Sequence, residues 1–182
     1  YESDLDLPSD SLTFAEDTVD SNLDGARSVY AADFDGDGIM DIVATGWWVD
    51  DVIWYEHDGH GSFTAHTIDS DLDGANGVYA IDMDRDGDVD VVATGDGADD
   101  VVWYENDGSK GFTKHTIDSN LVGAWGVYAI DMDNDGDIDV VAVGYYDDDV
   151  VWYENDGSEN FTRHIIDSDL DNAAGVYAVD LD

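Results

Sequence analysis

The sequence predicts an all-β protein built from repeated four-stranded antiparallel blades, the architecture of a β-propeller. Three observations support this fold class. The chain of 182 residues repeats itself every 49 residues, a period typical of propeller blades rather than of helical hairpins or leucine-rich repeats. Each period holds four short runs rich in β-formers, separated by turn residues. No stretch has the 3.6-residue spacing of an amphipathic helix, and Pro8 is the single proline.

The period that contains residues 126–167 serves as the guide to the strands. GVYAIDMD from Gly126 is the first strand and leads into an acidic loop. DVVAVG (139–144), DDVVWYE (148–154) and FTRHIID (161–167) are the second, third and fourth strands. NDGSEN joins the last two and is a hairpin signal, because Asn and Gly tolerate positive φ. Four such strands per unit, repeated radially, make a propeller.

The domain boundaries follow from the period. We expect one domain over residues 1–182, since 43% apolar content over this length is enough for a core. It divides into a partial blade, three full repeats and a second partial blade: 1–27, about 28–76, 77–125, 126–174, and 175–182. A blade joined from the two ends would still lack its second strand. The chain is then either cut from a longer array or completed by a neighbouring chain through strand addition.

Charge is the extreme feature of the composition. The chain has 46 acidic and 5 basic residues, for a net charge of -41. Nucleic acids and anionic lipid surfaces would be repelled, which excludes them as partners. There is no cysteine, and no apolar run approaches the ~18–20 residues of a membrane span. Because self-repulsion opposes the compact state unless it is screened, we expect a folded domain that needs cations.

Three acidic loops read D-x-D-x-D-G-x-x-D and predict calcium sites. Positions 1, 3 and 5 direct carboxylates inward, glycine at position 6 allows a sharp turn, and the carbonyl at position 7 and the aspartate at position 9 complete the shell. Such an oxygen-only shell favours Ca²⁺ over Zn²⁺, copper or Mg²⁺. Strand sequence follows each loop, so the loop closes a β-hairpin and not an EF-hand. The alternative, polar turns of an acidic protein, does not explain three copies at one spacing.

The predicted ligands, for about three Ca²⁺ per chain, are Asp33, Asp35, Asp37, Ile39 and Asp41; Asp82, Asp84, Asp86, Asp88 and Asp90; and Asp131, Asp133, Asp135, Asp137 and Asp139. Asp180 and Asp182 begin a truncated fourth copy and are candidate ligands of a partial site.

With these loops placed, the chain resembles the FG-GAP/VCBS repeat family, which includes the calcium-binding propellers of integrin α subunits and many microbial secreted proteins. The resemblance covers nearly the whole chain and rests on DMDNDGDIDVVAVG, DVVWYENDGSENFT and GVYAIDMD. The literal FG…GAP signature is absent, so the VCBS side is the closer match. The resemblance implies a propeller, Ca²⁺ in the loops, and an extracellular or cell-surface role in adhesion, glycan binding or scaffolding. It implies no single activity.

Other repeated residues are interpreted as structural. Histidines recur at equivalent fourth-strand positions, where they would lie on separate blades, far apart and towards the rim (His66, His115 and His164). Tryptophans recur in the third strand and are expected to pack between blades (Trp54, Trp103 and Trp152). No Ser-His-Asp order, phosphate loop or HExxH is present, and the calcium loops account for the paired carboxylates. We therefore expect no enzyme.

Two kinds of loop vary between repeats, and strand alternation places both on the face opposite the calcium loops. One lies between the second and third strands (47–49, 96–98 and 145–147), and the other holds Arg27, Asn76, Trp125 and Ala174 before the first strand. Scaffold residues repeat while this face varies and carries aromatics, as a recognition surface would. The candidate ligand-binding residues are Trp47, Trp48, Trp125, Tyr145 and Tyr146. The alternative is loop drift with partly buried aromatics.

Two functional hypotheses follow from these features. The first is a calcium-stabilised extracellular recognition or adhesion module that binds a glycan or protein ligand through the aromatic face. The second is a structural subunit that assembles with copies of itself into a fibre or surface layer by completing its partial blades. An accessory domain of a secreted enzyme is a third alternative, with no catalytic constellation to support it.

Overall fold

The computed structural model of the chain describes residues 16–180, which form twelve β-strands and no helix. No helix in this part of the chain is therefore long and apolar enough to span a membrane. The strands are β1 (Ala26–Ala32), β2 (Asp41–Gly46), β3 (Asp51–His57), β4 (Phe63–Asp69), β5 (Ala75–Ile81), β6 (Asp90–Gly95), β7 (Asp100–Asn106), β8 (Phe112–Asp118), β9 (Ala124–Ile130), β10 (Asp139–Gly144), β11 (Asp149–Asn155) and β12 (Phe161–Asp167).

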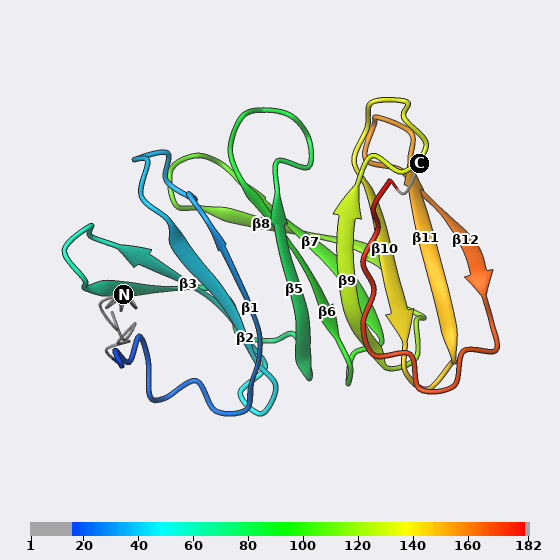
Figure 1. Ribbon diagram of the computed structural model, residues 1–182, viewed down its shortest axis with the longest axis horizontal. Coiled ribbons are helices and arrows are strands. Elements are labelled where there is room, and N and C mark those ends of the chain that lie inside the picture. Colours follow the sequence, from blue (N-terminus) through cyan, green and yellow to red (C-terminus); the bar gives the residue numbers. More distant parts are fainter. Residues whose placement is uncertain (1–15, 181–182) are drawn as a thin grey trace, which may run out of the picture.

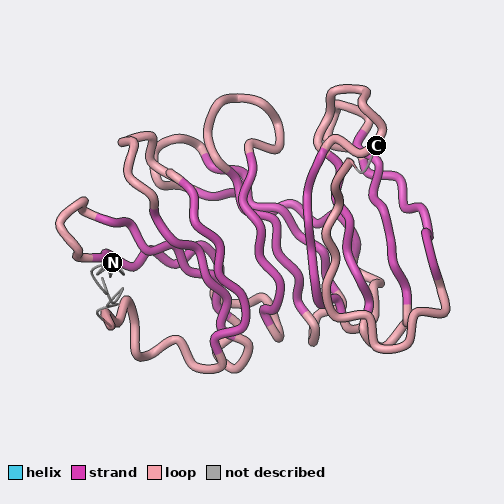
Figure 2. Tube along the Cα trace, viewed as in Figure 1, coloured by secondary structure: helices cyan, strands magenta, loops and turns pink. Residues whose placement is uncertain are grey.

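The strands pair in chain order into three four-stranded antiparallel sheets, β1–β4, β5–β8 and β9–β12. The sheets stand side by side in a row, and the first strands β1, β5 and β9 contact one another (Figure 1, Figure 2). The all-β class and the three four-stranded repeats are thus confirmed. The predicted strands at 139–144 and 161–167 coincide with β10 and β12, whereas the first strand of that repeat begins two residues earlier than predicted, at Ala124.

Each first strand begins with a register shift. The shift lies between Ala26 and Val29 in β1, and between Ala75 and Val78 in β5. In β9 the shift lies between Ala124 and Val127, which pair with Gly144 and Ala142 of β10. A bulge of this kind leaves residues out of the ladder and re-aims their side chains. The bulged positions include the variable residues Arg27, Asn76 and Trp125.

Equivalent residues pack each sheet against the next. Between the first two sheets, Phe34, Val43 and Trp54 meet Leu72 and Val91, all buried, together with further members of one cluster. The same positions of the next two sheets form a second cluster. Two of the repeated tryptophans are almost fully buried in these clusters, as predicted, and the third, on the last sheet, is half-buried (Trp54, Trp103 and Trp152). Apolar burial between sheets therefore holds the row together.

Two hydrogen-bond motifs repeat across the sheet junctions. The hydroxyl of Tyr104 donates to Asp69 Oδ2 at 2.7 Å, and that of Tyr153 donates to Asp118 Oδ2 at 2.8 Å. Burial raises the pKa of both phenols, so they stay protonated donors. Thr45 and Thr94 likewise donate to carbonyls of the next first strand, at Asn76 and Trp125 (2.5 and 2.6 Å). These bonds satisfy polar groups that the packing buries.

The two ends of the described chain continue these patterns. Tyr55 donates to Asp20 Oδ2 at 3.0 Å, so Asp20 takes the place that Asp69 and Asp118 take at the next junctions. Tyr177 continues a ladder of tyrosine rings spaced 4.5–4.6 Å apart along the row, the others being Tyr30, Tyr79 and Tyr128.

The ends lie at opposite ends of the row (Figure 1), so the described residues do not join into a fourth sheet. Residues 173–180 form no strand, and after β12 their trace turns back and runs beside β9 (Figure 1). Most of the predicted partial blade 1–27 lies outside the described residues, as do Pro8 and Asp182.

Candidate metal centres

The three acidic loops lie on one edge of the row, where they connect β1 to β2, β5 to β6 and β9 to β10 (Figure 1). The turns that connect β2 to β3, β6 to β7 and β10 to β11 lie on the opposite edge. Glycine at position 6 has positive φ in every loop, 86° at Gly38, 103° at Gly87 and 105° at Gly136. The predicted sharp turn at this position is confirmed, and only glycine adopts it without strain.

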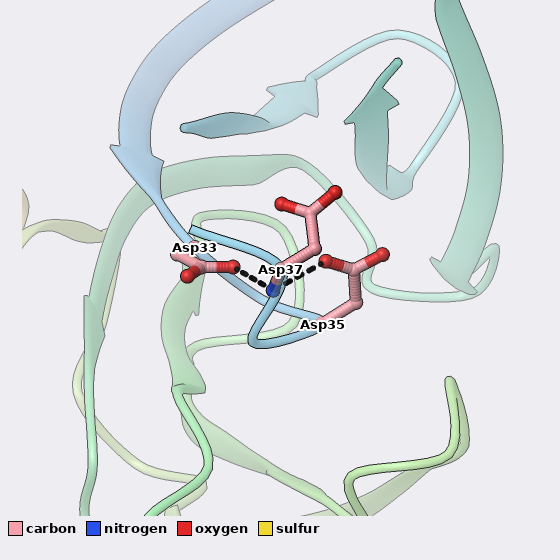
Figure 3. A group of neighbouring side chains, drawn as sticks. All are labelled: Asp33, Asp35 and Asp37. Atoms are coloured by element: carbon pink, nitrogen blue, oxygen red, sulfur yellow. Dashed lines mark hydrogen bonds between the residues drawn. The ribbon is translucent and has the colours of Figure 1, made fainter. Parts of the chain in front are cut away.

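The first loop gathers three carboxylates around its own backbone. Asp33, Asp35 and Asp37 each place an oxygen within 4.8 Å of the others. The amide of Asp37 donates to Asp33 Oδ1 at 3.1 Å and to Asp35 Oδ1 at 3.3 Å, as Figure 3 shows. The amide of Gly38 donates to Asp33 Oδ2 at 2.9 Å. The loop therefore curls around a point toward which positions 1, 3 and 5 turn their oxygens.

The other two loops repeat this arrangement with one difference. Asp82, Asp84 and Asp86 gather in the second loop, whereas Asp131 and Asp133 gather with Asp139 in the third. Position 5 of the third loop, Asp135, is outside that group. Its Oδ1 accepts from the amide of Asp137 at 2.8 Å, a bond that position 5 also makes in the other two loops.

Two buried carboxylate oxygens in these loops are without a hydrogen-bond partner among the described residues. They are Oδ1 of Asp82 and Oδ1 of Asp131, which both occupy position 1. A buried, unpaired carboxylate oxygen is costly, and a bound cation would supply the missing partner. The donor set is made only of oxygens, which is the set that hard cations such as Ca²⁺ prefer. The residues present therefore fit a bound divalent cation.

Position 9 has a role that the sequence did not reveal. Asp41, Asp90 and Asp139 are at most 1% exposed. Asp90 accepts from the amides of Met83 and Asn106, both at 2.8 Å, and Asp139 makes the equivalent bonds at 3.0 and 2.8 Å. Asp41 also accepts from Trp54 Nε1 at 3.0 Å. Burial raises the pKa of Asp90 to about 7 and also raises that of Asp139. This carboxylate ties the start of the loop to the end of the third strand.

The remaining predicted ligands have these places. The amides at position 7 donate to the position-5 carboxylates at 2.7, 2.9 and 2.8 Å, and the carbonyls of the same residues stay predictions (Ile39, Asp88 and Asp137). Asp180 ends the described chain, and Asp182 lies beyond it.

The repeated histidines lie in three different sheets, as expected. Each bonds a glutamate of its own sheet through Nε2 and stacks on the neighbouring tryptophan. His66 is 2.7 Å from Glu56 Oε2, and its ring centroid is 4.6 Å from that of Trp54. His115 and His164 repeat both contacts. The structure does not bring the histidines together into one site.

The aromatic residues of the variable face divide into two groups. Trp47, Trp125 and Tyr145 are half-buried. Trp47 Nε1 donates to Asp96 Oδ2 at 3.1 Å, and the rings of Trp125 and Tyr145 lie 4.9 Å apart. The other two rings, Trp48 and Tyr146, are 67% and 64% exposed. The structure thus brings the predicted residues to one edge but leaves only two of them widely accessible.

Arg27 belongs to the same edge, although sequence reasoning did not select it as a binding residue. Its guanidinium lies over the ring of Trp47 at 5.2 Å and over that of Trp125 at 5.4 Å. The available signal was its charge, since it is the one basic residue at the variable positions of this face.

Comparison with known proteins agrees with this architecture. A family model described as FG-GAP-like repeat matches three overlapping stretches, residues 33–93, 82–142 and 131–182. No curated protein matches the chain. The closer likeness to the VCBS side stays a prediction. Each match begins at the first aspartate of an acidic loop, and together they cover most of the sequence. The chain therefore belongs to the FG-GAP-like repeat family.

Proposed function

We propose that this chain is a calcium-binding, extracellular β-propeller or propeller segment that recognises a ligand through the face opposite its calcium loops. The observation that carries the proposal is a difference between the two edges of the row of sheets. One edge repeats the same carboxylate loop three times, with orphaned buried oxygens in two copies. The other edge varies from repeat to repeat and presents aromatic rings.

The propeller architecture is supported by the uniformity of the junctions. The same tyrosine–aspartate bond and the same set of apolar positions join the first sheet to the second and the second to the third. A step that repeats in this way generates a ring if its rotation closes, which is how propeller blades are arranged.

The calcium function is supported by electrostatics. Each loop holds three carboxylates within 4.8 Å, in a chain whose net charge is -41. Like charges at this distance repel, and a divalent ion would convert the repulsion into coordination. Extracellular modules of this kind bind Ca²⁺ at about 10⁻⁴–10⁻³ M, which matches calcium levels outside the cell.

Calcium should stabilise the fold strongly. A ligand at 100 times its Kd adds about 2.7 kcal/mol of unfolding free energy per site. For a chain of this size we expect the melting temperature in 10 mM Ca²⁺ to exceed that in EGTA by about 5 °C or more. Thermal denaturation followed by circular dichroism measures the difference.

The control tests whether the loops cause the effect. A triple variant, Asp33→Asn, Asp82→Asn and Asp131→Asn, should lose most of the calcium response. A matched variant at exposed aspartates outside the loops, Asp17→Asn, Asp24→Asn and Asp171→Asn, should keep it. An unchanged midpoint in the native chain would falsify the structural-calcium proposal.

The recognition function is supported by how the exposed rings are held. The Trp48 ring lies against Gly25, where a Cβ would come within 3.1–3.2 Å of ring carbons, and the Tyr146 ring lies against Gly123 in the same way. An exposed ring that rests on glycine backbone is fixed before a ligand arrives, which lowers the entropy cost of binding. Gly97 takes the equivalent position in the middle repeat, so that repeat presents no ring there.

Trp48→Ala should therefore weaken ligand capture strongly while leaving the fold intact. Removing an exposed aromatic anchor costs about 2 kcal/mol or more of binding free energy, or about thirtyfold in affinity. A glycan array, followed by titration of the best ligand, gives the measurement. Ile165→Ala removes an exposed apolar side chain from β12 and should bind as the native chain does. Equal binding by both variants would contradict the role of this face.

A specific observation favours the alternative function, self-assembly. The first sheet exposes the face that the second and third sheets bury. Val29 is 65% exposed whereas its equivalent Val78 is 6% exposed. A cavity of about 400 Å³ lies on this face, lined by Leu23, Ile42 and Tyr55 among others. Another repeat of the same kind, from a second copy, would cover it as the first two sheets cover their neighbours.

If assembly is the function, light scattering in calcium should give masses well above 19.8 kDa that rise with concentration. Val29→Asp should lower these masses, because it places a charge in the junction. Val122→Asp makes the same change outside this face and should leave them unchanged. A monomer mass at every concentration would exclude this alternative.

A further inference from the structure

Arg27 is held in an unusual place for a basic residue of this chain. It lies in the bulge that opens β1, and its guanidinium lies over the ring of Trp47, which follows β2, and over that of Trp125 in β9, at 5.2 and 5.4 Å. Two cation–π contacts restrain the guanidinium. The N–H groups on its edge are the part left to meet a ligand.

Arg27 also differs from the other basic residues in its partners. Arg85, Lys110, Lys114 and Arg163 each have a carboxylate oxygen within 4.0 Å. Among residues 16–180 no such ion pair involves Arg27, although the chain has 46 acidic residues. In this environment a cation without a carboxylate partner is the exception, and an anionic group on a ligand would supply that partner.

The ligand chemistry follows from the groups around Arg27. A planar guanidinium with free edges matches a carboxylate in a bidentate pair. The β2–β3 and β10–β11 turns lie on one edge (Figure 1), and they carry the exposed rings of Trp48 and Tyr146, which offer flat apolar faces. We propose that this edge binds a glycan that carries carboxylate groups, a uronic-acid-containing oligosaccharide, with Arg27 on the carboxylate and the rings on sugar faces. The proposal rests on the recognition function proposed above.

The net charge restricts the glycan further. At -41 the chain repels densely charged polyanions, while screening over about 8 Å at physiological salt leaves a single carboxylate at Arg27 free to bind. A heavily sulfated chain would bring many negative charges close to a chain whose net charge is -41. A sparsely carboxylated oligosaccharide would bring one to the cation and its neutral rings to the aromatics.

The test compares neutral, uronate-containing and sulfated glycans on one array, with acidic peptides as a further arm, in millimolar calcium. The native chain should bind uronate glycans best. Arg27→Gln should weaken that binding about tenfold to hundredfold, since a charge-assisted bidentate contact is lost. Arg27→Lys keeps the positive charge but loses the two parallel N–H donors of the guanidinium, so its affinity should lie between those of the native chain and Arg27→Gln. Arg163→Gln removes the same charge from β12, where Arg163 pairs with Asp118 and Asp149, and should leave the binding unchanged.

A change on the ligand keeps the protein intact. Reducing the uronate carboxyl to an alcohol should weaken binding to the native chain as much as Arg27→Gln does, and should have no effect on Arg27→Gln itself. Binding to neutral glycans with no loss in Arg27→Gln would overturn the inference but leave the recognition function standing. Preference for sulfated glycans or acidic peptides would overturn the ligand class. Binding to none of the four arms would overturn the recognition function.

A second observation carries an independent inference about the calcium loops. Lys110, on the turn between β7 and β8, reaches back to the preceding repeat. Its Nζ lies 2.6 Å from Glu56 Oε2 and 3.7 Å from Asp35 Oδ2 of the first loop. The equivalent residue of the third repeat is Glu159, which lines a cavity of about 70 Å³ together with Asp84 and Arg85 of the second loop. Arg85 is paired with Asp137 of the third loop at 3.4 Å. Residues of opposite charge thus stand beside equivalent loops.

We infer that the first loop binds Ca²⁺ more weakly than the second. The ammonium group of Lys110 near Asp35 repels an incoming divalent cation and competes for the carboxylate. Glu159, in the cavity that Asp84 lines, attracts the cation, and the charge of Arg85 in that cavity is offset by its pair with Asp137. The inference rests on the calcium function proposed above. Sites that share one sequence pattern would then fill at different calcium concentrations.

Calorimetric calcium titration of the whole chain tests this order. Lys110→Gln should tighten the weakest site by about threefold to tenfold, and Glu159→Lys should weaken the second loop by a similar factor. Asp35→Asn should remove the same calcium-binding step of the titration that Lys110→Gln shifts. This result would assign that step to the first loop. Lys114→Gln removes a lysine from the same sheet, paired with Asp69 away from the loops, and should leave the titration unchanged.

The outcomes separate the two proposals. Three equal sites, or no response to Lys110→Gln while calcium still binds, would overturn the inference alone. No heat of binding in any variant would overturn the calcium function itself.

Discussion

The structure depends on one buried carboxylate in each repeat, at position 9 of the acidic loop. Asp90 is fully buried and accepts hydrogen bonds from the amide of Met83 at the start of the loop and from that of Asn106 at the end of β7. A buried carboxylate is costly unless such donors surround it. The loop must therefore return to the third strand in one register. Met83 enters the core at the same point, so the loop and the packing between sheets form one unit.

The 49-residue period and the turn residues were enough to predict the strands, because each repeat has the same order of β-forming runs and turns. Chemistry that depends on distant contacts was harder to predict. The sequence assigned Asp90 to a metal shell and missed its anchoring bonds, since the amide of Asn106 comes beside it only after β6 and β7 have paired. Arg27 and Trp125 lie two repeats apart, and no local pattern places their side chains together. The bulge that re-aims Arg27 also leaves no composition signal.

Repetition makes the differences between repeats informative. A scaffold position keeps the same residue in every repeat because every junction between sheets imposes the same packing on it. A difference between repeats at equivalent positions therefore indicates a local function or a local contact. Lys110 and Glu159 share a position and differ in charge, and each stands beside the loop of the preceding repeat. Gly97 separates the exposed rings of Trp48 and Tyr146 along the row. Both contrasts concern edges of the sheets, where packing imposes no identity on the side chain.

The scarcity of positive charge adds a constraint of its own. The four ion-paired basic residues all reach from one sheet to a neighbouring one: Lys110 to Glu56, Lys114 to Asp69, Arg85 to Asp137 and Arg163 to Asp118. Exposed pairs of this kind contribute only about 0–1 kcal/mol each. Three calcium ions would cancel about six of the 41 net charges. Most of the repulsion therefore remains between carboxylates on the surface. Salt in the solvent weakens this repulsion, because repulsive charge pairs far outnumber attractive ones there. Calcium orders the loops locally, while the stability of the whole row is left to apolar burial and to the ionic strength around it.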